Sequence, residues 1–300
     1  MKQKVLIIVG PTASGKSALG VALARRLEGE VISADSRQVY RGLDIGTGKI
    51  TKREAKSIPH HLLDIASPRK AFSAGDFAKM AHAAIHEIAR RGKLPIVVGG
   101  TGFYIDALFG RITLPEVAPD AKLRARLSRK SASQLFAMLK KADPRRAEAM
   151  DTPSERNNTV RLIRALEVSK ARNAPMMENV SPSYDSLWIG IAPSDTVLRL
   201  KIEKRLAERL KKGMVKEARS LHAGGLSYKR MRELGLEYRS LARFLQKQIT
   251  REQLETELKS DIWRYAKKQR GYWKRNKDIR CFDPKQTKQI AMAVEKWKKR

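Results

Sequence analysis

The sequence predicts an α/β fold in which a parallel β-sheet is flanked by helices and interrupted by an all-helical insertion. Two observations carry this prediction. Short apolar runs, at 5–9, 31–33, 95–98 and 187–191, alternate with amphipathic helical patterns, and one central segment contains no strand candidate. Strands that alternate with helices pair in parallel, so their carboxyl ends should meet at one edge of the sheet. We expect any ligand site at that edge.

The first apolar run, Val5–Val9, leads into the pattern G-x-x-x-x-G-K-[ST], which is typical of a phosphate-binding loop between a strand and a helix. This motif predicts a sheet of the P-loop NTPase-like class. Its glycines let successive N–H groups turn toward one anion, its lysine adds a positive charge, and its serine hydroxyl can bind Mg²⁺ held by the phosphates. The sequence therefore predicts a di- or triphosphate site, with Mg²⁺ as cofactor on Ser17, made by Gly10, Pro11, Thr12, Ala13, Ser14, Gly15, Lys16 and Ser17.

Helical patterns account for most of the remaining core. The helix after the phosphate loop is expected over 16–27, with Gly29 ending it. Further helices are expected after the fourth strand, over 195–212, 214–223, 229–247 and 251–276.

Residues 111–184 form the predicted insertion. A linker at 111–120 carries Pro115 and Pro119, helical patterns follow at 121–130, 133–142 and 155–172, and a proline-containing loop closes the segment at 173–184. We therefore expect a catalytic core made of 1–110 and 185–300 with a helical C-terminal part, and a separate helical domain at 111–184.

The charge indicates a polyanionic partner. The chain has 63 Lys and Arg against 31 Asp and Glu, a net charge of +32, and the excess is densest in residues 261–300. A small nucleotide needs only a few cations, whereas a nucleic acid is attracted along a whole basic surface. A generally basic proteome is the alternative explanation.

Cysteine content and hydropathy favour a cytoplasmic protein. The chain has a single cysteine, Cys281, so it can form no internal disulfide, which fits a reducing compartment. The first apolar run is too short for a signal peptide or a membrane span. We expect a cytoplasmic protein that does not interact with membranes.

Asp35 directly follows the strand at 31–33 and is the candidate general base. An acid that binds magnesium through water is an equally good interpretation. Gln38 can hydrogen-bond a nucleobase edge. Thr101 lies in a Gly-Gly-Thr-Gly turn, where its hydroxyl either reaches a substrate or caps the next helix.

Three other features are ambiguous or weak on sequence alone. Arg205 lies among other basic residues of a helix, where generic surface charge is the default. His60 and His61 are adjacent, so their side chains diverge and zinc binding is not expected. The run 263–275 alternates cations with aromatic rings, which suits phosphate contacts and base stacking but also a helix with a buried aromatic face.

Taken together, the motifs come in the order seen in tRNA dimethylallyltransferases, also called tRNA isopentenyltransferases, and the chain is similar to that family over nearly its whole length. The blocks that carry the resemblance are Gly10–Ser17, Asp35–Tyr40, Gly42–Thr47, His60–Asp64, Ser73–Phe77, Gly99–Gly102, Arg161–Val168 and Tyr265–Gln269.

The resemblance implies transfer of a dimethylallyl group from dimethylallyl diphosphate to the N6 amine of the adenosine 3′ of the anticodon, in tRNAs that read codons beginning with U. It implies that the phosphate loop holds this diphosphate, that Asp35 is the base, and that Thr101 and Arg205 bind the substrate and stabilise the leaving diphosphate. The target adenine would be flipped into a channel that the diphosphate enters from the other side. A monomer is expected. The tRNA contacts that the resemblance implies, on the anticodon stem-loop, are Asp35, Ser36, Arg37, Gln38, Thr101, Arg124, Val160, Arg161, Leu162, Ile163 and Arg164.

The chain departs from the family pattern at three places. Asn157-Asn158 stands where Asn-Asp is usual, Gly271-Tyr-Trp273 replaces Thr-Trp-Phe, and the block Met231–Tyr238 is a looser match to Ile-Gly-Tyr-Lys-Glu.

Rival hypotheses use the same phosphate loop. They are a small-molecule or nucleoside kinase, a prenyltransferase for free adenine nucleotides, and a nucleic-acid-binding module that uses a nucleotide as a switch.

Overall fold

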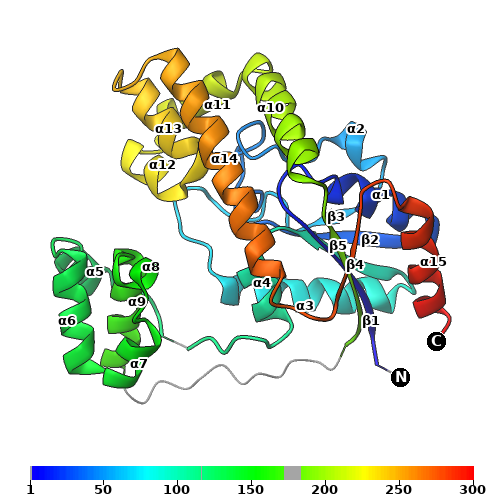
Figure 1. Cartoon of the computed structure of the whole chain (residues 1–300), viewed down its shortest axis with the longest axis horizontal. Coiled ribbons are helices and arrows are strands. Elements are labelled where there is room, and N and C mark those ends of the chain that lie inside the picture. The colour runs from blue at the N-terminus through cyan, green and yellow to red at the C-terminus, as the bar shows by residue number, and fades with distance from the viewer. Residues whose placement is uncertain (1, 116, 172–183) are drawn as a thin grey trace. The chain divides into compact units, whose positions relative to one another are not determined.

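The computed structural model of the chain describes residues 2–115, 117–171 and 184–300. The chain divides into two compact units (Figure 1). The first, called here the sheet unit, combines residues 1–111 with 181–300, and the second, the helical unit, spans 112–180.

The sheet unit is built on six parallel strands in the order β3-β2-β4-β1-β5-β6. The predicted strands correspond to β1 (Lys4–Val9), β2 (Gly29–Ala34), β4 (Leu94–Gly99) and β5 (Asp185–Ile191). The parallel α/β fold predicted from sequence is thereby confirmed. The two edge strands, β3 (His60–His61) and β6 (Ile279–Phe282), were not predicted, because they are short and lack a continuous apolar run.

Helices cover both faces of this sheet, which explains why its central strands are continuously apolar. On one face, α1 (Lys16–Leu27) and α15 (Thr287–Lys298) contribute Leu23, Ile290 and Trp297 to a core cluster with Ile8 and Ile96. The helices α3 (Ala74–Arg90) and α4 (Gly102–Leu108) pack together, and α3 contacts β2 and β4. The sequence predicted no element for either α3 or α15. Both ends of the chain lie on the same side of the sheet unit (Figure 1).

The C-terminal half of the sheet unit is helical. It contains α10 (Asp195–Lys211), α11 (Met214–Ala223), α12 (Tyr228–Leu234), α13 (Leu236–Leu245) and α14 (Arg251–Trp273). A short helix, α2 (Lys52–Ala55), lies in the N-terminal half of the chain. One continuous helix over 229–247 is therefore wrong, because Gly235 has a φ of 73° and separates α12 from α13. Helix α14 extends from the neighbourhood of α13 to that of α4 (Figure 1).

Gly29 has a different role from the predicted one. Helix α1 ends at Leu27 and is capped by Glu28, which itself has a left-handed φ of 54°, and Gly29 opens β2 instead. A Cβ atom at Gly29 would lie 2.7 Å from the Leu94 carbonyl oxygen of the neighbouring strand. The glycine thus permits close strand pairing rather than a helix cap.

The helical unit contains α5 (Ala121–Leu127), α6 (Ala132–Ala142), α7 (Pro144–Ala149), α8 (Pro153–Arg156) and α9 (Thr159–Lys170). It has a core of its own, in which Leu127, Leu135, Leu139 and Leu162 are fully buried. The helix predicted over 155–172 is found as α9 but begins later, because Asn158 caps α9, its Oδ1 accepting a hydrogen bond from the Arg161 N–H at 3.2 Å. Most of the predicted loop at 173–184 lies outside the described residues.

In the described part of the chain, no helix combines the length and apolar composition needed to cross a membrane.

Truncation of Ile96 should measure the strength of the sheet core. Ile96 is fully buried in β4, so Ile96→Ala should lower the free energy of unfolding by about 2–5 kcal/mol, through lost burial and the cavity that remains. The control is Met292→Ala, on the exposed side of α15, which should change it by less than about 0.5 kcal/mol. Urea denaturation of both variants checks this, and similar losses in the two would contradict the assigned core.

Candidate active site

The phosphate loop connects β1 to α1 and has the backbone geometry of an anion nest. Gly10 and Gly15 have φ values of 157° and 99°, and Ala13 between them is also left-handed at 61°. Gly15 is the N-cap of α1 and supplies no side-chain cap, so the first N–H groups of the helix have no side-chain acceptor. Such a helix start favours a bound anion.

A hollow lies beside this loop. Residues from the ends of β2 and β4 join the loop there, so the convergence expected at the carboxyl edge is found. Its lining residues are Thr12, Lys16, Ser17, Val31, Ser33, Asp35, Gln38, Thr47, Ile50, His60, Val98, Gly99 and Arg205.

Lys16 is half-buried and brings a positive charge into the hollow. Burial lowers the pKa of its ammonium from 10.5 to about 8; the nearby Asp35 carboxylate opposes that shift, and the Arg205 guanidinium adds to it. The Lys16 Nζ donates to the Pro11 carbonyl oxygen at 3.2 Å. The free site therefore holds a partly destabilised positive charge, which a bound anion would stabilise.

Asp35 is held in a tight turn at the end of β2. Its Oδ1 accepts hydrogen bonds from the backbone N–H of Arg37 at 2.9 Å and of Gln38 at 3.3 Å. The carboxylate is half-buried and lines the same hollow as Lys16 and Ser17. Its position is compatible with either role left open by the sequence, a proton acceptor or a magnesium-binding acid.

Thr101 is the N-cap residue of α4, yet its side chain makes no capping hydrogen bond. Its Oγ1 instead accepts from the backbone N–H of Ser36 at 3.0 Å, and its own N–H donates to the Ala34 carbonyl at 3.2 Å. Thr101 thus fastens the turn after β4 to the turn that carries Asp35.

Arg205 is not the surface residue that composition alone suggests. Its side chain projects from α10 into the hollow, where burial and the neighbouring Arg209 lower the pKa of its guanidinium. The Nη2 donates to the Gly48 carbonyl oxygen at 2.6 Å. Tertiary packing brings this cation to Lys16 and Asp35, which no spacing in the sequence reveals.

A second hollow adjoins the first. It lies between α1 and α10, and it shares Lys16, Ser17, Ile50 and Arg205 with the first hollow. The remaining lining is partly apolar, including Ala18, Val21 and Ala22 of α1. The phosphate loop can therefore be approached from two sides.

Helix α14 carries most of the run 263–275 and has one buried and one exposed face. Gln269 is buried and bridges two site loops: its Oε1 accepts from the Thr12 N–H at 2.8 Å and its Nε2 donates to the Gly100 carbonyl at 2.9 Å. Trp273 is also buried, whereas Lys267 and Lys268 are exposed. One face of the helix packs on the site and the other carries positive charge to solvent.

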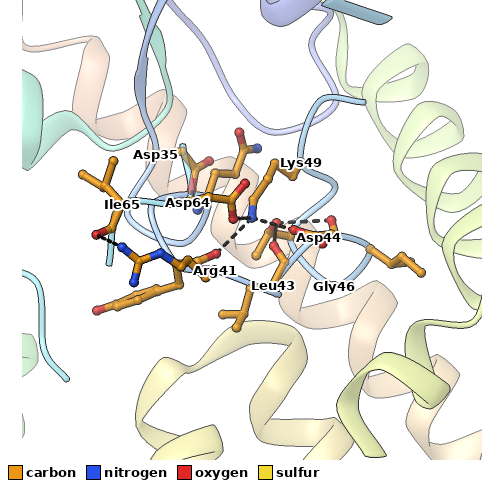
Figure 2. A network of polar contacts seen from close by, with 12 residues as sticks. Asp35, Arg41, Leu43, Asp44, Gly46, Lys49, Asp64 and Ile65 are labelled. Atoms are coloured by element: carbon orange, nitrogen blue, oxygen red, sulfur yellow. Dashed lines mark hydrogen bonds and ion pairs between the residues drawn. The ribbon is translucent and has the colours of Figure 1, made fainter. Parts of the chain in front are cut away.

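A buried lysine that the sequence analysis missed joins two of the motif blocks (Figure 2). The Lys49 side chain is only 6% exposed and lies between two carboxylates, Asp44 at 2.6 Å and Asp64 at 2.5 Å. Its ammonium also donates to the Tyr40 carbonyl at 2.9 Å. The signal was present, since each of the blocks 42–47 and 60–64 contains one aspartate.

The two adjacent histidines have separate partners. The Nδ1 of His60 lies 2.8 Å from the Ile58 carbonyl oxygen, and the Nε2 of His61 lies 2.7 Å from the buried Glu30 carboxylate. Over residues 2–115, 117–171 and 184–300, no group of three or more His, Cys, Asp or Glu side chains could hold a metal ion.

The predicted tRNA-contact residues of the helical unit differ in accessibility. Arg124 makes a two-pronged ion pair with Glu167 at 2.6 and 2.7 Å, and Arg164 contacts the same carboxylate at 3.2 Å. Val160 is 76% exposed, whereas Leu162 is fully buried in the core of the unit. The side chain of Leu162 packs in the core of the unit.

Comparison with known proteins decides the family. The IPP transferase family model matches residues 38–277. The tRNA dimethylallyltransferase of Leuconostoc citreum is 41% identical over 271 residues, covering 90% of each chain. The tRNA dimethylallyltransferase 1 of Geotalea uraniireducens is 42% identical over 275 residues, covering 92% of this chain and 89% of its own. The chain belongs to the IPP transferase family.

Solved structures of this family have the same fold. The full-length tRNA isopentenylpyrophosphate transferase of Bacillus halodurans matches with a TM-score of 0.74 and 36% identity, over 99% of this chain and 97% of that one. A eukaryotic dimethylallyltransferase crystallised while acting on tRNA matches with a TM-score of 0.76 and 26% identity, over 94% and 74% of the two chains.

Two departures from the family pattern have a local structural role. Asn158 caps α9 through its side-chain oxygen, as an aspartate at this position also could. In Gly271-Tyr-Trp273, the Tyr272 hydroxyl donates to the Asp106 carboxylate of α4, and Trp273 is buried. Helix α14 thereby stays attached to α4.

Removal of the Lys49 ammonium should weaken the joined loops. Lys49→Met deletes three hydrogen bonds and leaves Asp44 and Asp64 facing each other, so the free energy of unfolding should fall by about 1–3 kcal/mol. The control is Lys79→Met on the exposed side of α3, which should cost less than about 0.5 kcal/mol. Chemical denaturation measures both, and equal stability of the two variants would show that the network is dispensable.

Proposed function

We propose that the protein transfers a dimethylallyl group from dimethylallyl diphosphate to the N6 amine of the adenosine 3′ of the anticodon, in tRNAs that read codons beginning with U. The observation that carries the proposal is the placement of Asp35 across one hollow from Lys16 and Arg205, in a member of the IPP transferase family. The relatives named above act, by their names, on tRNA. The net charge of +32 favours a large polyanionic substrate.

The reaction is a displacement at the allylic carbon. The bond between that carbon and the diphosphate oxygen breaks, and its electron pair leaves with the diphosphate. The lone pair of the adenine N6 forms the new carbon–nitrogen bond, and Asp35 accepts the proton that the amine loses. As the allylic bond breaks, negative charge grows on the diphosphate, where Lys16, the phosphate-loop amides and Arg205 stabilise it.

Magnesium fits the donors of this hollow. The Ser17 hydroxyl lines the hollow and would hold the ion through its oxygen, and the described chain offers no group of three or more His, Cys, Asp or Glu side chains that could do so instead. Mg²⁺ binds preferentially through one or two protein oxygens together with substrate phosphates. When bound, it supplies charge neutralisation on the diphosphate.

Two sides of the phosphate loop suit two substrates. The hollow between α1 and α10, with its partly apolar lining, would admit dimethylallyl diphosphate. The target adenine, flipped out of the anticodon loop, would enter beside Asp35, Gln38 and Thr101. Contacts to the anticodon stem-loop would come from Ser36 and Arg37 in the sheet unit. In the helical unit they would come from Arg124 and the exposed side chains of 160–164.

All of these residues belong to one chain, so we propose a monomeric enzyme. We also propose that it acts in the cytoplasm, where its tRNA substrate is available.

Incubation with labelled dimethylallyl diphosphate and Mg²⁺ tests the function. Label should appear in tRNA and not in AMP, and ATP should not be hydrolysed or used to phosphorylate a nucleoside. Label in AMP would favour a prenyltransferase for free nucleotides. ATP turnover without prenyl transfer would favour the kinase or the nucleotide switch.

Two substitutions of Asp35 test whether it is the proton acceptor or only forms the turn after β2. Asp35→Ala should lower turnover at least about a hundredfold with little change in tRNA binding, because it removes the proton acceptor. Asp35→Asn keeps the oxygen that accepts from Arg37 and Gln38 but lacks basicity, so its turnover should be as low as that of the alanine variant. Single-turnover rates and tRNA binding measure both variants. Near-normal turnover of Asp35→Asn would reduce Asp35 to a turn-forming residue.

The pKa of Lys16 predicts the pH dependence of diphosphate binding. Its folded pKa of about 8 lies below the ordinary value of 10.5, so the ammonium is charged below pH 8 and loses its proton above it. Above pH 8, diphosphate binding then requires Lys16 to take up a proton. The Kd for diphosphate should therefore rise about tenfold between pH 7 and pH 9. Lys16→Arg stays charged throughout, so the ratio of the two affinities cancels the titration of the ligand itself. A constant ratio would contradict the assignment.

A further inference from the structure

The turn formed by residues 44–48, called here the 44–48 turn, has its backbone bound from both sides by side chains of the helical C-terminal region. On one side, the Glu217 carboxylate of α11 accepts three consecutive N–H groups: Asp44 at 3.0 Å, Ile45 at 2.6 Å and Gly46 at 2.8 Å. Successive N–H groups that converge in this way form an anion nest. A protein carboxylate fills this nest, so it is a structural clamp rather than a ligand site.

The carbonyl groups of the same turn point to two arginines of α10. Arg209 is 8% exposed and donates through its Nε to the Ile45 carbonyl at 2.7 Å and through its Nη2 to the Gly46 carbonyl. Arg205 donates to the Gly48 carbonyl at 2.6 Å. The turn is therefore held between an acidic residue and two basic residues that lie more than 150 positions away in the chain.

Two further contacts fix the clamp. Tyr238 lies on α13 and is only 1% exposed, and its hydroxyl donates to Glu217 at 2.7 Å. Glu237, also on α13, forms an ion pair with Arg209 of α10 at 2.9 Å. Space beside the turn is minimal, since a Cβ at Gly46 would lie 2.3 Å from the Tyr238 hydroxyl oxygen. The Glu217 carboxylate is thus held by the backbone of the 44–48 turn and by the Tyr238 hydroxyl.

The position of Arg205 depends on this turn. A Cβ at Gly48 would lie 2.3 Å from its Nη2, so the turn and the guanidinium are in close contact. We infer that Glu217 is a positioning residue: by binding the N–H groups of the 44–48 turn, it fixes the Gly48 carbonyl that orients Arg205 toward the diphosphate. The inference rests on the proposed function, in which Arg205 contacts that diphosphate.

The test is a double-mutant cycle on the binding of inorganic diphosphate with Mg²⁺, measured by calorimetry. Glu217→Gln places an amide NH₂ where a carboxylate oxygen now accepts, so at least one N–H of the turn loses its acceptor. We expect the Kd to rise about tenfold or more, as for loss of a charge-assisted hydrogen bond. In an Arg205→Gln background the same substitution should raise the Kd less than about twofold, because the two residues act through one contact.

Two further variants keep the test decisive. Tyr238→Phe removes only the hydroxyl that holds Glu217, and it serves in the same cycle if Glu217→Gln does not fold. Glu255→Gln is the matched control, since this exposed carboxylate pairs with Arg251 within α14, and it should leave the Kd unchanged.

The outcomes separate the inference from the proposed function. Two results would overturn the positioning role of Glu217. One is a double variant, Glu217→Gln with Arg205→Gln, whose rise in Kd equals the product of the two single rises. The other is full affinity for diphosphate in both Glu217→Gln and Tyr238→Phe. A folded wild-type protein that binds no diphosphate and labels no tRNA would instead overturn the proposed function. If the wild type is active and the cycle shows coupling, both stand.

Discussion

The ammonium of Lys16 shares one hollow with the Asp35 carboxylate and the Arg205 guanidinium, and the rest of the site is arranged around that cation. A lysine deprived of water loses much of the preference for its charged form, which is why its pKa falls to about 8. The Asp35 carboxylate alone does not offset the two effects that lower the pKa of Lys16, its burial and the nearby Arg205 guanidinium. A site in this electrostatic state is prepared for a strongly anionic ligand, and it gains most when negative charge increases during a reaction.

Several residues around Lys16 lie in loops, and loops need support to hold a fixed geometry. Here the support comes from side chains, two of them on helices far away in the sequence. Gln269 of α14 connects the phosphate loop to the turn after β4, Glu217 of α11 holds the 44–48 turn, and Lys49 joins that turn to Asp64. Buried side chains with several hydrogen bonds can fix a backbone that lacks regular structure, because each unpaired polar group would be costly.

The two units carry their positive charge in different ways. In the helical unit, Arg124 and Arg164 share the Glu167 carboxylate, so part of its basic charge is already paired within the unit. In α14, by contrast, Lys267 and Lys268 lie on the exposed side of a helix whose other side packs on the site. Exposed cations of this kind attract a polyanion over a distance, while paired arginines hold the shape of a surface.

Local sequence determined the central strands, the phosphate loop and the positions of Asp35 and Thr101 at strand ends, because these depend on short apolar runs, on glycine and on the geometry of a parallel sheet. The order of the motifs also determined the family. The helix break at Gly235 was missed because apolar residues at 231, 234, 238 and 241 keep a helical period across it. The start of α9 after Asn158 was missed although asparagine is a common N-cap residue. Only the tertiary structure decided which charged residues are buried. Arg205, Arg209, Glu217 and Lys49 resemble solvent-exposed charges in the sequence, and their roles arise from partners on other elements that no local pattern encodes.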